Sequence, residues 1–141
     1  MWLKRQSGVP KATLAQLGSL ETEVMERIWT RGEISVRDLH HELSGRLAYT
    51  TLMTTLDRLF KKALLQRRKQ GKAFFYVPAC TEQEYQEQLT GHLFGMALRE
   101  NKDRDAVLSC FVETISENDS EMLDRLDEMV KAKRRALRRK E

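Results

Sequence analysis

Apolar residues recur at intervals of three and four positions along most of the chain, which is the spacing of one helical face. In the first half, this spacing predicts three helices, over residues 19–31, 35–43 and 48–62. Ser19 and Ser35 are the expected N-caps of the first two, because a serine oxygen accepts a hydrogen bond from the free N–H groups of the first turn. Three short amphipathic helices in succession predict a small helical core.

The third of these helices has two dissimilar sides. Its inward stripe is expected to contain Leu52, Leu56 and Leu59, with Ala63 extending it. Hydroxyl groups crowd the rest of the helix, although threonine and tyrosine are poor choices for helix stability. We interpret the following residues as selected for something other than the helix itself: Tyr49, Thr50, Thr51, Thr54 and Thr55.

Two strand-like runs follow, over residues 64–69 and 72–78, with the pair Gln70-Gly71 between them. This pattern predicts a β-hairpin, and Pro78 is expected to end its second strand. The connector at residues 33–35 can form another short strand. The hairpin is expected to have a basic tip made of Arg67, Arg68, Lys69 and Lys72.

The second half is again helical in pattern. The sequence Thr81-Glu82-Gln83-Glu84 is a capping box that predicts a fourth helix, a fifth is expected near residues 103–115, and Ser116 is expected to cap a sixth. Their apolar stripes are more than residues 79–130 can bury alone, so we expect them to wrap around a second copy. The residues assigned to that dimer interface are Tyr85, Leu89, Leu93, Phe94, Leu108, Phe111, Val112, Leu123, Leu126, Met129 and Val130.

The expected fold class is mainly α with a small β-hairpin: a winged helix-turn-helix head followed by a three-helix dimerisation tail. Four segments are predicted: a flexible basic leader at 1–16, the DNA-binding head at 17–78, the dimerisation region at 79–130 and a basic extension at 131–141. In a winged helix-turn-helix the third helix enters the major groove. The hairpin then reaches the neighbouring phosphates.

The net charge of +4 hides a strong segregation along the chain. The leader and the head carry +3 and +4, the dimerisation region carries −9, and the basic extension carries +6. A basic head is expected to meet a polyanion, and an acidic tail is expected to stay away from it. The basic extension has two interpretations, an auxiliary DNA arm or a solubilising cap that suits a helix C-terminus, and the second is favoured.

The composition suits a folded, soluble protein, with 40% hydrophobic and 33% charged residues. No run of about 18 apolar residues is present, so we expect no membrane insertion. The N-terminal residues lack the apolar stretch of a signal peptide. The expected location is therefore the cytoplasm.

Nothing in the sequence indicates catalysis, a metal or a cofactor. The chain has no phosphate-binding glycine loop, nucleophile elbow or metal triad. We expect no ligand role for His40, His41 or His92, the only histidines. Cys80 and Cys110 are too few for a disulfide framework and are expected to be inert, partly buried thiols, with a redox role or an intersubunit bridge left open. The protein is predicted not to be an enzyme.

Two stretches resemble the penicillinase-repressor family. Residues 17–29, LGSLETEVMERIW, are similar to the opening helix of that family, and residues 48–59, AYTTLMTTLDRL, are similar to its recognition helix. The hairpin at 64–78 is similar too, and the tail matches by layout. The recognition-helix string is the specific part of the resemblance.

The resemblance implies a homodimeric repressor on a palindromic operator of double-stranded DNA. It also implies a membrane sensor metalloprotease as a partner that triggers cleavage of the repressor's tail. Family DNA contacts map onto the third helix and onto the wing near residues 68–72. The full set of predicted DNA-binding residues is Arg46, Tyr49, Thr50, Thr51, Met53, Thr54, Arg58, Lys62, Arg68, Lys69 and Lys72.

The chain departs from the family pattern in two places. It contains no Asn-Phe pair, the bond at which the best-known members are cut, so inactivation needs another bond or another signal. It also lacks the C-terminal cysteine cluster of copper-responsive relatives, so copper sensing is not expected. Nothing in the sequence supports a link to β-lactams.

A different class of function also fits the predicted fold. A winged helix can dock a protein partner without reading DNA, in which case the threonine-rich side is only a solvated surface. The tail can also pack on its own head instead of on a second copy. Retention on heparin and a mobility shift of the chain's own upstream DNA distinguish these alternatives.

Overall fold

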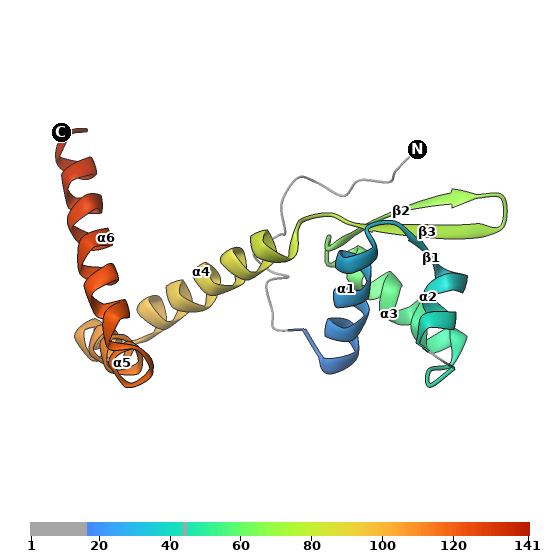
Figure 1. Ribbon diagram of the computed structural model, residues 1–141, viewed down its shortest axis with the longest axis horizontal. Helices are drawn as coiled ribbons and strands as arrows, with labels where there is room; N and C mark the ends of the chain where they lie inside the picture. The colour runs from blue at the N-terminus through green and yellow to red at the C-terminus, as the bar shows by residue number, and fades with distance from the viewer. Residues whose placement is uncertain (1–16, 44) are drawn as a thin grey trace. The chain divides into compact units, whose positions relative to one another are not determined.

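The structure is a computed structural model that describes residues 17–43 and 45–141 (Figure 1). The predicted leader, and Ser44 at the predicted end of the second helix, lie outside the described residues. The chain divides into two compact units, the first ending at Leu93 and the second running from Phe94. We call them the head unit and the tail unit. Within the described ranges, no helix is long and apolar enough to cross a membrane.

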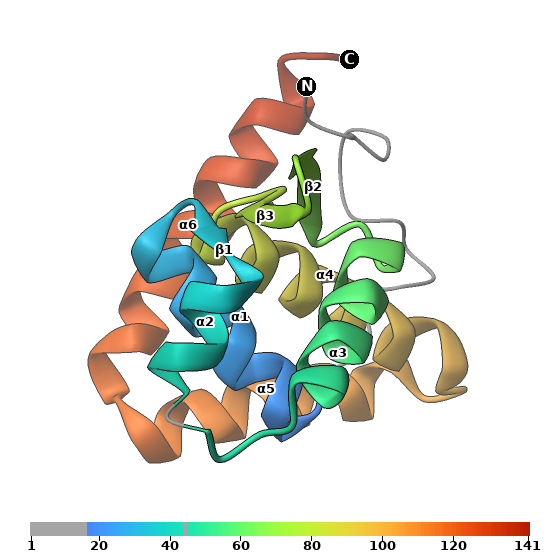
Figure 2. The same cartoon turned by 90° about the vertical axis from the view of Figure 1, so that its right-hand side faces the viewer.

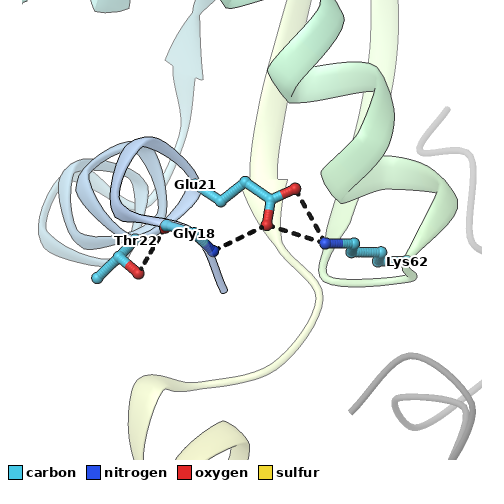
Figure 3. A network of polar contacts seen from close by, with 4 residues as sticks. All are labelled: Gly18, Glu21, Thr22 and Lys62. Atoms are coloured by element: carbon cyan, nitrogen blue, oxygen red, sulfur yellow. Dashed lines mark hydrogen bonds and ion pairs between the residues drawn. The ribbon is translucent and has the colours of Figure 1, made fainter. Parts of the chain in front are cut away.

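The first helix, α1 (Ser19–Arg31), is capped by Gly18 and not by Ser19 as predicted. The Gly18 N–H donates to the Glu21 carboxylate over 3.4 Å, and the Gly18 carbonyl accepts from the Thr22 hydroxyl over 3.0 Å (Figure 3). Ser19 already lies inside the helix, so its side chain is past the capping position. Gly32 ends the helix as predicted, with a φ of 79° that suits glycine.

The next elements are β1 (Ile34–Ser35), α2 (Val36–Glu42) and α3 (Tyr49–Lys61). The Ser35 hydroxyl accepts a hydrogen bond from the Asp38 N–H over 3.0 Å, which confirms the predicted cap. The prediction that Ala63 extends the α3 stripe is wrong. Its φ of 61° turns the chain out of the helix, and its side chain is buried in the turn that follows.

The hairpin consists of β2 (Leu65–Gln70) and β3 (Ala73–Pro78), joined by Gly71 and Lys72. The turn therefore lies one residue later than predicted, and its positive φ falls on Gly71, where glycine is favoured. β1 also pairs antiparallel with β3, which gives a three-stranded sheet of order β1-β3-β2. The wing is thus tied to the helical core through its inner strand.

Helix α4 (Glu82–Glu100) starts with the predicted capping box. The Thr81 N–H donates to the Glu84 carboxylate over 2.8 Å, and the Glu84 N–H donates to the Thr81 hydroxyl over 3.1 Å. The boundary between the two units falls within α4. The first turns of α4 belong to the head unit.

Trp29 of α1 contacts the start of α4 and the residues just before it. Its Nε1–H donates to the Cys80 carbonyl over 2.9 Å, and its ring lies 5.7 Å from the ring of Tyr85. Tyr85 is only 3% exposed. The core of the head unit therefore includes a residue of α4, and its buried members are Val24, Met25, Ile28, Ile34, Val36, Leu39, Leu43, Leu52, Leu56, Leu59, Phe60, Leu64, Leu65, Tyr76 and Tyr85.

The tail unit holds the end of α4 with α5 (Arg104–Asn118) and α6 (Ser120–Arg138). Asp119 caps α6, accepting from the Glu121 N–H over 3.0 Å. The prediction of a cap at Ser116 is wrong, because that residue is still inside α5, where its hydroxyl donates to a backbone carbonyl. The α6 helix also continues well past the predicted end of its stripe.

Candidate nucleic-acid interface

The two sides of α3 differ as the sequence predicts. Leu52, Leu56 and Leu59 are all 0% exposed, so they anchor the helix to the rest of the head unit. Thr50, Thr51 and Thr54 are exposed on the opposite side. Figure 2 shows α3 at the surface of the head, beside α2 and below the sheet. The helix therefore presents a hydroxyl-rich face whose threonines are exposed along its first two turns.

The hydroxyl groups on this face have different hydrogen-bonding capacities. The Thr54 hydroxyl donates to the Thr50 carbonyl over 2.9 Å, so its oxygen is left mainly as an acceptor. The hydroxyls of Thr50 and Thr51 make no hydrogen bond within the described part of the chain, so they can both donate and accept. Thr55 differs from the rest, because it is buried and donates to the Thr51 carbonyl over 2.9 Å. It belongs to the core side of α3.

Three further predicted contact residues flank the threonines. Tyr49 is half exposed at the start of α3, with its ring edge-on to His40 at 5.4 Å. His40 in turn hydrogen-bonds the Leu47 carbonyl over 2.9 Å, which fixes the segment that leads into the helix. Met53 is partly buried and packs against the core. Arg58 is exposed one turn after Thr54.

Arg67 is not at the tip of the wing as the sequence predicts. Its guanidinium lies 4.0 Å above the Phe60 ring and 3.2 Å from the Asp57 carboxylate, so it connects β2 to the back of α3. The pKa of Asp57 is lowered, chiefly because Lys61 donates a hydrogen bond to the carboxylate and also because Arg67 does. Arg67 therefore stabilises the wing against the helix.

The outer part of the wing carries the remaining predicted cations. The Arg68 guanidinium pairs with Glu33, donates to the Gln70 side chain over 2.6 Å and lies 4.4 Å above the Phe75 ring. Lys69 and Lys72 are exposed at the end of the hairpin. These two ammonium groups are the most accessible charges of the wing for a polyanion.

A recess of about 320 Å³ lies where the start of α2, the start of α3 and the wing meet. Its lining combines aromatic and small side chains with two cations, Arg37 and Lys72. Arg37 was not among the predicted DNA-binding residues. On the sequence it is an ordinary solvent-facing residue of the second helix, and only the folded chain brings it near the wing.

Two other predicted DNA-binding residues are engaged inside the head unit. Figure 3 shows the Lys62 ammonium on both oxygens of the Glu21 carboxylate, at 2.9 Å each. The two side chains are only 29% and 15% exposed, so this pair links the end of α3 to the start of α1. Arg46, which lies between α2 and α3, pairs with Glu23 on the surface of α1. The structure thus gives both cations carboxylate partners.

The residues predicted for the dimer interface fall into two groups. Tyr85 is buried in the core of the head unit, and Leu89 packs against that core. In the tail unit, the Phe94 and Phe111 rings contact each other at 5.1 Å. The large apolar residues of α4 to α6 that are exposed are Leu93, Leu108, Phe111, Val112, Met122, Met129, Val130 and Leu137. Leu123 and Leu126 are partly buried.

The two cysteines lie in different environments. Cys80 is partly buried as predicted, and burial raises the pKa of its thiol. Cys110 is exposed, so the expectation of partial burial is wrong there. Among the described residues, no group of three or more histidine, cysteine, aspartate or glutamate side chains could hold a metal ion.

A three-helix core with a β-hairpin wing and an outward hydroxyl-rich third helix defines a winged-helix DNA-binding regulator. The family described as Penicillinase repressor matches residues 17–131, and the chain belongs to that family. The resemblance found in the sequence is thereby confirmed. The protein is a transcriptional repressor and not an enzyme.

The relatives match most of the chain. It is 38% identical over 120 residues to Transcriptional regulator BlaI of Mycobacterium tuberculosis, covering 81% of this chain and 84% of that protein. It is 30% identical over 118 residues to Penicillinase repressor of Bacillus licheniformis, covering 82% and 88%. Among solved structures, the DNA-binding domain of the repressor BlaI is 33% identical with a TM-score of 0.47, covering 57% of this chain and 94% of that one.

Proposed function

We propose that this repressor binds double-stranded operator DNA in the cytoplasm as a homodimer, with each head reading one half of a two-fold symmetric site. The observation that carries the proposal is the exposed face of Thr50, Thr51 and Thr54 on a helix whose leucines are fully buried. Such a helix keeps its position when it enters the major groove. Its first turns are the part that reaches base edges.

The hydroxyl pattern suggests how bases are distinguished. The Thr54 oxygen accepts from a base amino group, on adenine N6 or cytosine N4, because its own hydrogen is used by the Thr50 carbonyl. Thr50 and Thr51 can instead donate to guanine or thymine oxygens. Threonine methyl groups also pack against the thymine methyl.

Phosphates are proposed to contact the cations around this face. Lys69 and Lys72 on the wing and Arg58 on α3 are exposed, and Arg37 lines the recess beside Lys72. Such contacts fix the protein on the duplex without reading its sequence. We therefore add Arg37 to the contact set and assign Lys62 a structural role within the head.

The tail unit is proposed to hold two copies together. Its exposed apolar residues need a covering surface, and a second tail supplies one of the same composition. Pairing also places two heads on half-sites about 34 Å apart, which raises affinity for a symmetric operator. Relief of repression is proposed to separate the subunits, through a membrane sensor metalloprotease or another signal.

The test uses the full chain and the DNA upstream of its own gene. We expect a mobility shift at nanomolar concentrations, a footprint of two symmetric half-sites, and affinity that falls steeply with salt. Sedimentation of the same sample should show a dimer. A protein that neither shifts this DNA nor binds heparin would instead favour the alternative, a winged-helix module that docks another protein.

A further inference from the structure

Arg67, on β2, joins the wing to α3 through two contacts of different kinds. Its guanidinium lies 3.2 Å from one oxygen of the Asp57 carboxylate, and the Lys61 ammonium lies 2.8 Å from the other oxygen. The central carbon of the guanidinium also lies 4.0 Å from the centroid of the Phe60 ring. Asp57 and Phe60 both belong to α3, so one helix holds this side chain of the wing by charge and by stacking.

The same side chain is connected to a cation near the tip of the wing. Arg67 lies opposite Tyr76 of β3 in the register of the sheet and donates a hydrogen bond to the Tyr76 hydroxyl. Side chains alternate along a strand, so Lys69 lies on the same face of the sheet as Arg67. The Phe74 ring contacts both, with its centroid 6.0 Å from the Arg67 guanidinium and 5.6 Å from the Lys69 ammonium. A row of contacts therefore runs from α3 through Arg67 and Phe74 to Lys69.

A stabilising role alone does not account for an arginine at this position. Its Nε–H is buried and finds no acceptor within residues 17–43 and 45–141, and such a group costs stability. A methionine of similar length would pack against Phe60 and Phe74 without that cost. A methionine could not fix a direction, whereas the planar guanidinium donates to Asp57 and Tyr76 while its face covers an aromatic ring.

The wing needs a directional contact because its buried anchor lies at its base. Leu65, at the start of β2, is 1% exposed, and the strand becomes exposed towards Gln70. Lys69 follows Leu65 by four residues, which is about 13 Å along a strand. A rotation of the hairpin by about 15° around Leu65 would move Lys69 by about 3 Å, which is enough to break a hydrogen bond to a phosphate.

We propose that Arg67 is a positioning residue for DNA binding, which fixes the wing relative to α3 so that Lys69 and Lys72 reach the phosphates while the threonines of α3 lie on the bases. This inference rests on the DNA contacts of the proposed function and adds the residue that lets them form together. Arg67 acts through the two lysines and does not itself contact DNA. The leucines of α3 are fully buried without its help, so the base contacts of α3 do not depend on it.

The first test compares variants of the full chain on a duplex that the wild-type chain selects from a randomised pool. Arg67→Met should weaken binding by about tenfold and lower the slope of log affinity against log salt by about two, because two lysine contacts are lost. In a Lys69→Ala/Lys72→Ala chain, the same Arg67→Met change should weaken binding by less than about twofold, because no lysine at the tip remains to be misplaced. Fluorescence anisotropy over a series of salt concentrations measures both quantities.

Two further variants separate positioning from other roles. Arg58→Ala removes a proposed phosphate contact on α3, so its effect on affinity should multiply with that of Arg67→Met. Arg67→Lys keeps an ion pair with Asp57 but lacks the planar group, so its affinity should lie between those of the wild type and Arg67→Met. A merely structural role would lower the urea midpoint and leave the salt slope of the folded protein unchanged. If Arg67→Met does not fold, Arg67→Lys carries the same comparisons.

The second test measures the position of the wing without DNA, in a chain with Cys80→Ser and Cys110→Ser. Spin labels at Arg58→Cys and Lys72→Cys report the distance between α3 and the tip of the wing by double electron–electron resonance. An excess of unlabelled chain keeps distances between subunits out of the signal. We expect one narrow distribution of distances, which Arg67→Met should broaden.

Three results would overturn the inference. They are an affinity and salt slope of Arg67→Met equal to those of the wild type, an effect of Arg67→Met that is undiminished in the Lys69→Ala/Lys72→Ala chain, and a distance distribution that Arg67→Met leaves unchanged. The second result would indicate that Arg67 contacts DNA directly. A wild-type chain that selects no duplex would overturn the proposed DNA contacts as well. A chain that selects a duplex and gives any of the three results would overturn the inference alone.

Discussion

Helices α3 and α6 are both amphipathic, but the apolar face of α3 is buried and much of the apolar face of α6 is exposed. The leucines of α3 are 0% exposed, whereas Met129 and Leu137 of α6 are 66% and 54% exposed. The head unit buries its apolar face within one chain, and the tail unit does not. An apolar face that is fully used within the chain leaves the opposite, polar face as the functional one. The apolar face that α6 leaves exposed is part of the surface that we propose for pairing with a second copy.

The largest expected effect comes from truncating the buried side of α3. Leu56→Ala should lower the free energy of unfolding of the head by about 3–5 kcal/mol, because a fully buried leucine leaves a cavity. Urea denaturation measures it. Leu137→Ala is the matched control on α6, and its effect on the head should stay within about 0.5 kcal/mol. Equal losses of unfolding free energy in Leu56→Ala and Leu137→Ala would contradict this difference between the two helices.

A charge on the exposed face of the tail unit should act on assembly and not on the head. Phe111→Asp is expected to weaken dimerisation by about 100-fold, because it places a carboxylate in an apolar interface. Analytical ultracentrifugation gives the constant, and the affinity of a single head for a half-site duplex should be unchanged. The account of the tail would be wrong if the variant remained a dimer.

A smaller effect separates a structural lysine from a DNA contact. Lys62→Met should cost the head about 1 kcal/mol of stability, because Glu21 loses its partner across α1 and α3. It should leave DNA affinity and its salt dependence unchanged. A phosphate contact would instead show as a salt slope reduced by about one.

Much of the head could be predicted from its sequence, because helical spacing and caps are local signals. The leucine stripe of α3, the cap at Ser35, the stop at Gly32 and the capping box at Thr81 are all confirmed. Two of the predicted N-caps are wrong, because a nearby residue occupies the N-cap position instead. Gly18 replaces Ser19, and Asp119 replaces a serine that was equally plausible by composition.

The site could be predicted less completely, because charge on the sequence does not reveal its partner in the fold. Arg67 was predicted at the basic tip of the hairpin, but in the fold it contacts Phe60 and Asp57. Lys62 was predicted to bind DNA, but it pairs with Glu21. Whether such a cation is engaged within the protein depends on contacts between segments that are distant in sequence. They also brought Arg37 to the wing, which no local pattern indicated.

The most direct measurement compares base preference with overall affinity. Selection from a randomised duplex pool should show that Thr51→Ala with Thr54→Ala loses preference at the bases under α3, by about 1–3 kcal/mol per position. Lys69→Ala should weaken every sequence alike. We therefore expect the threonine variant to lose base preference and the lysine variant to lose only overall affinity. An unchanged sequence preference in the double threonine variant would contradict it.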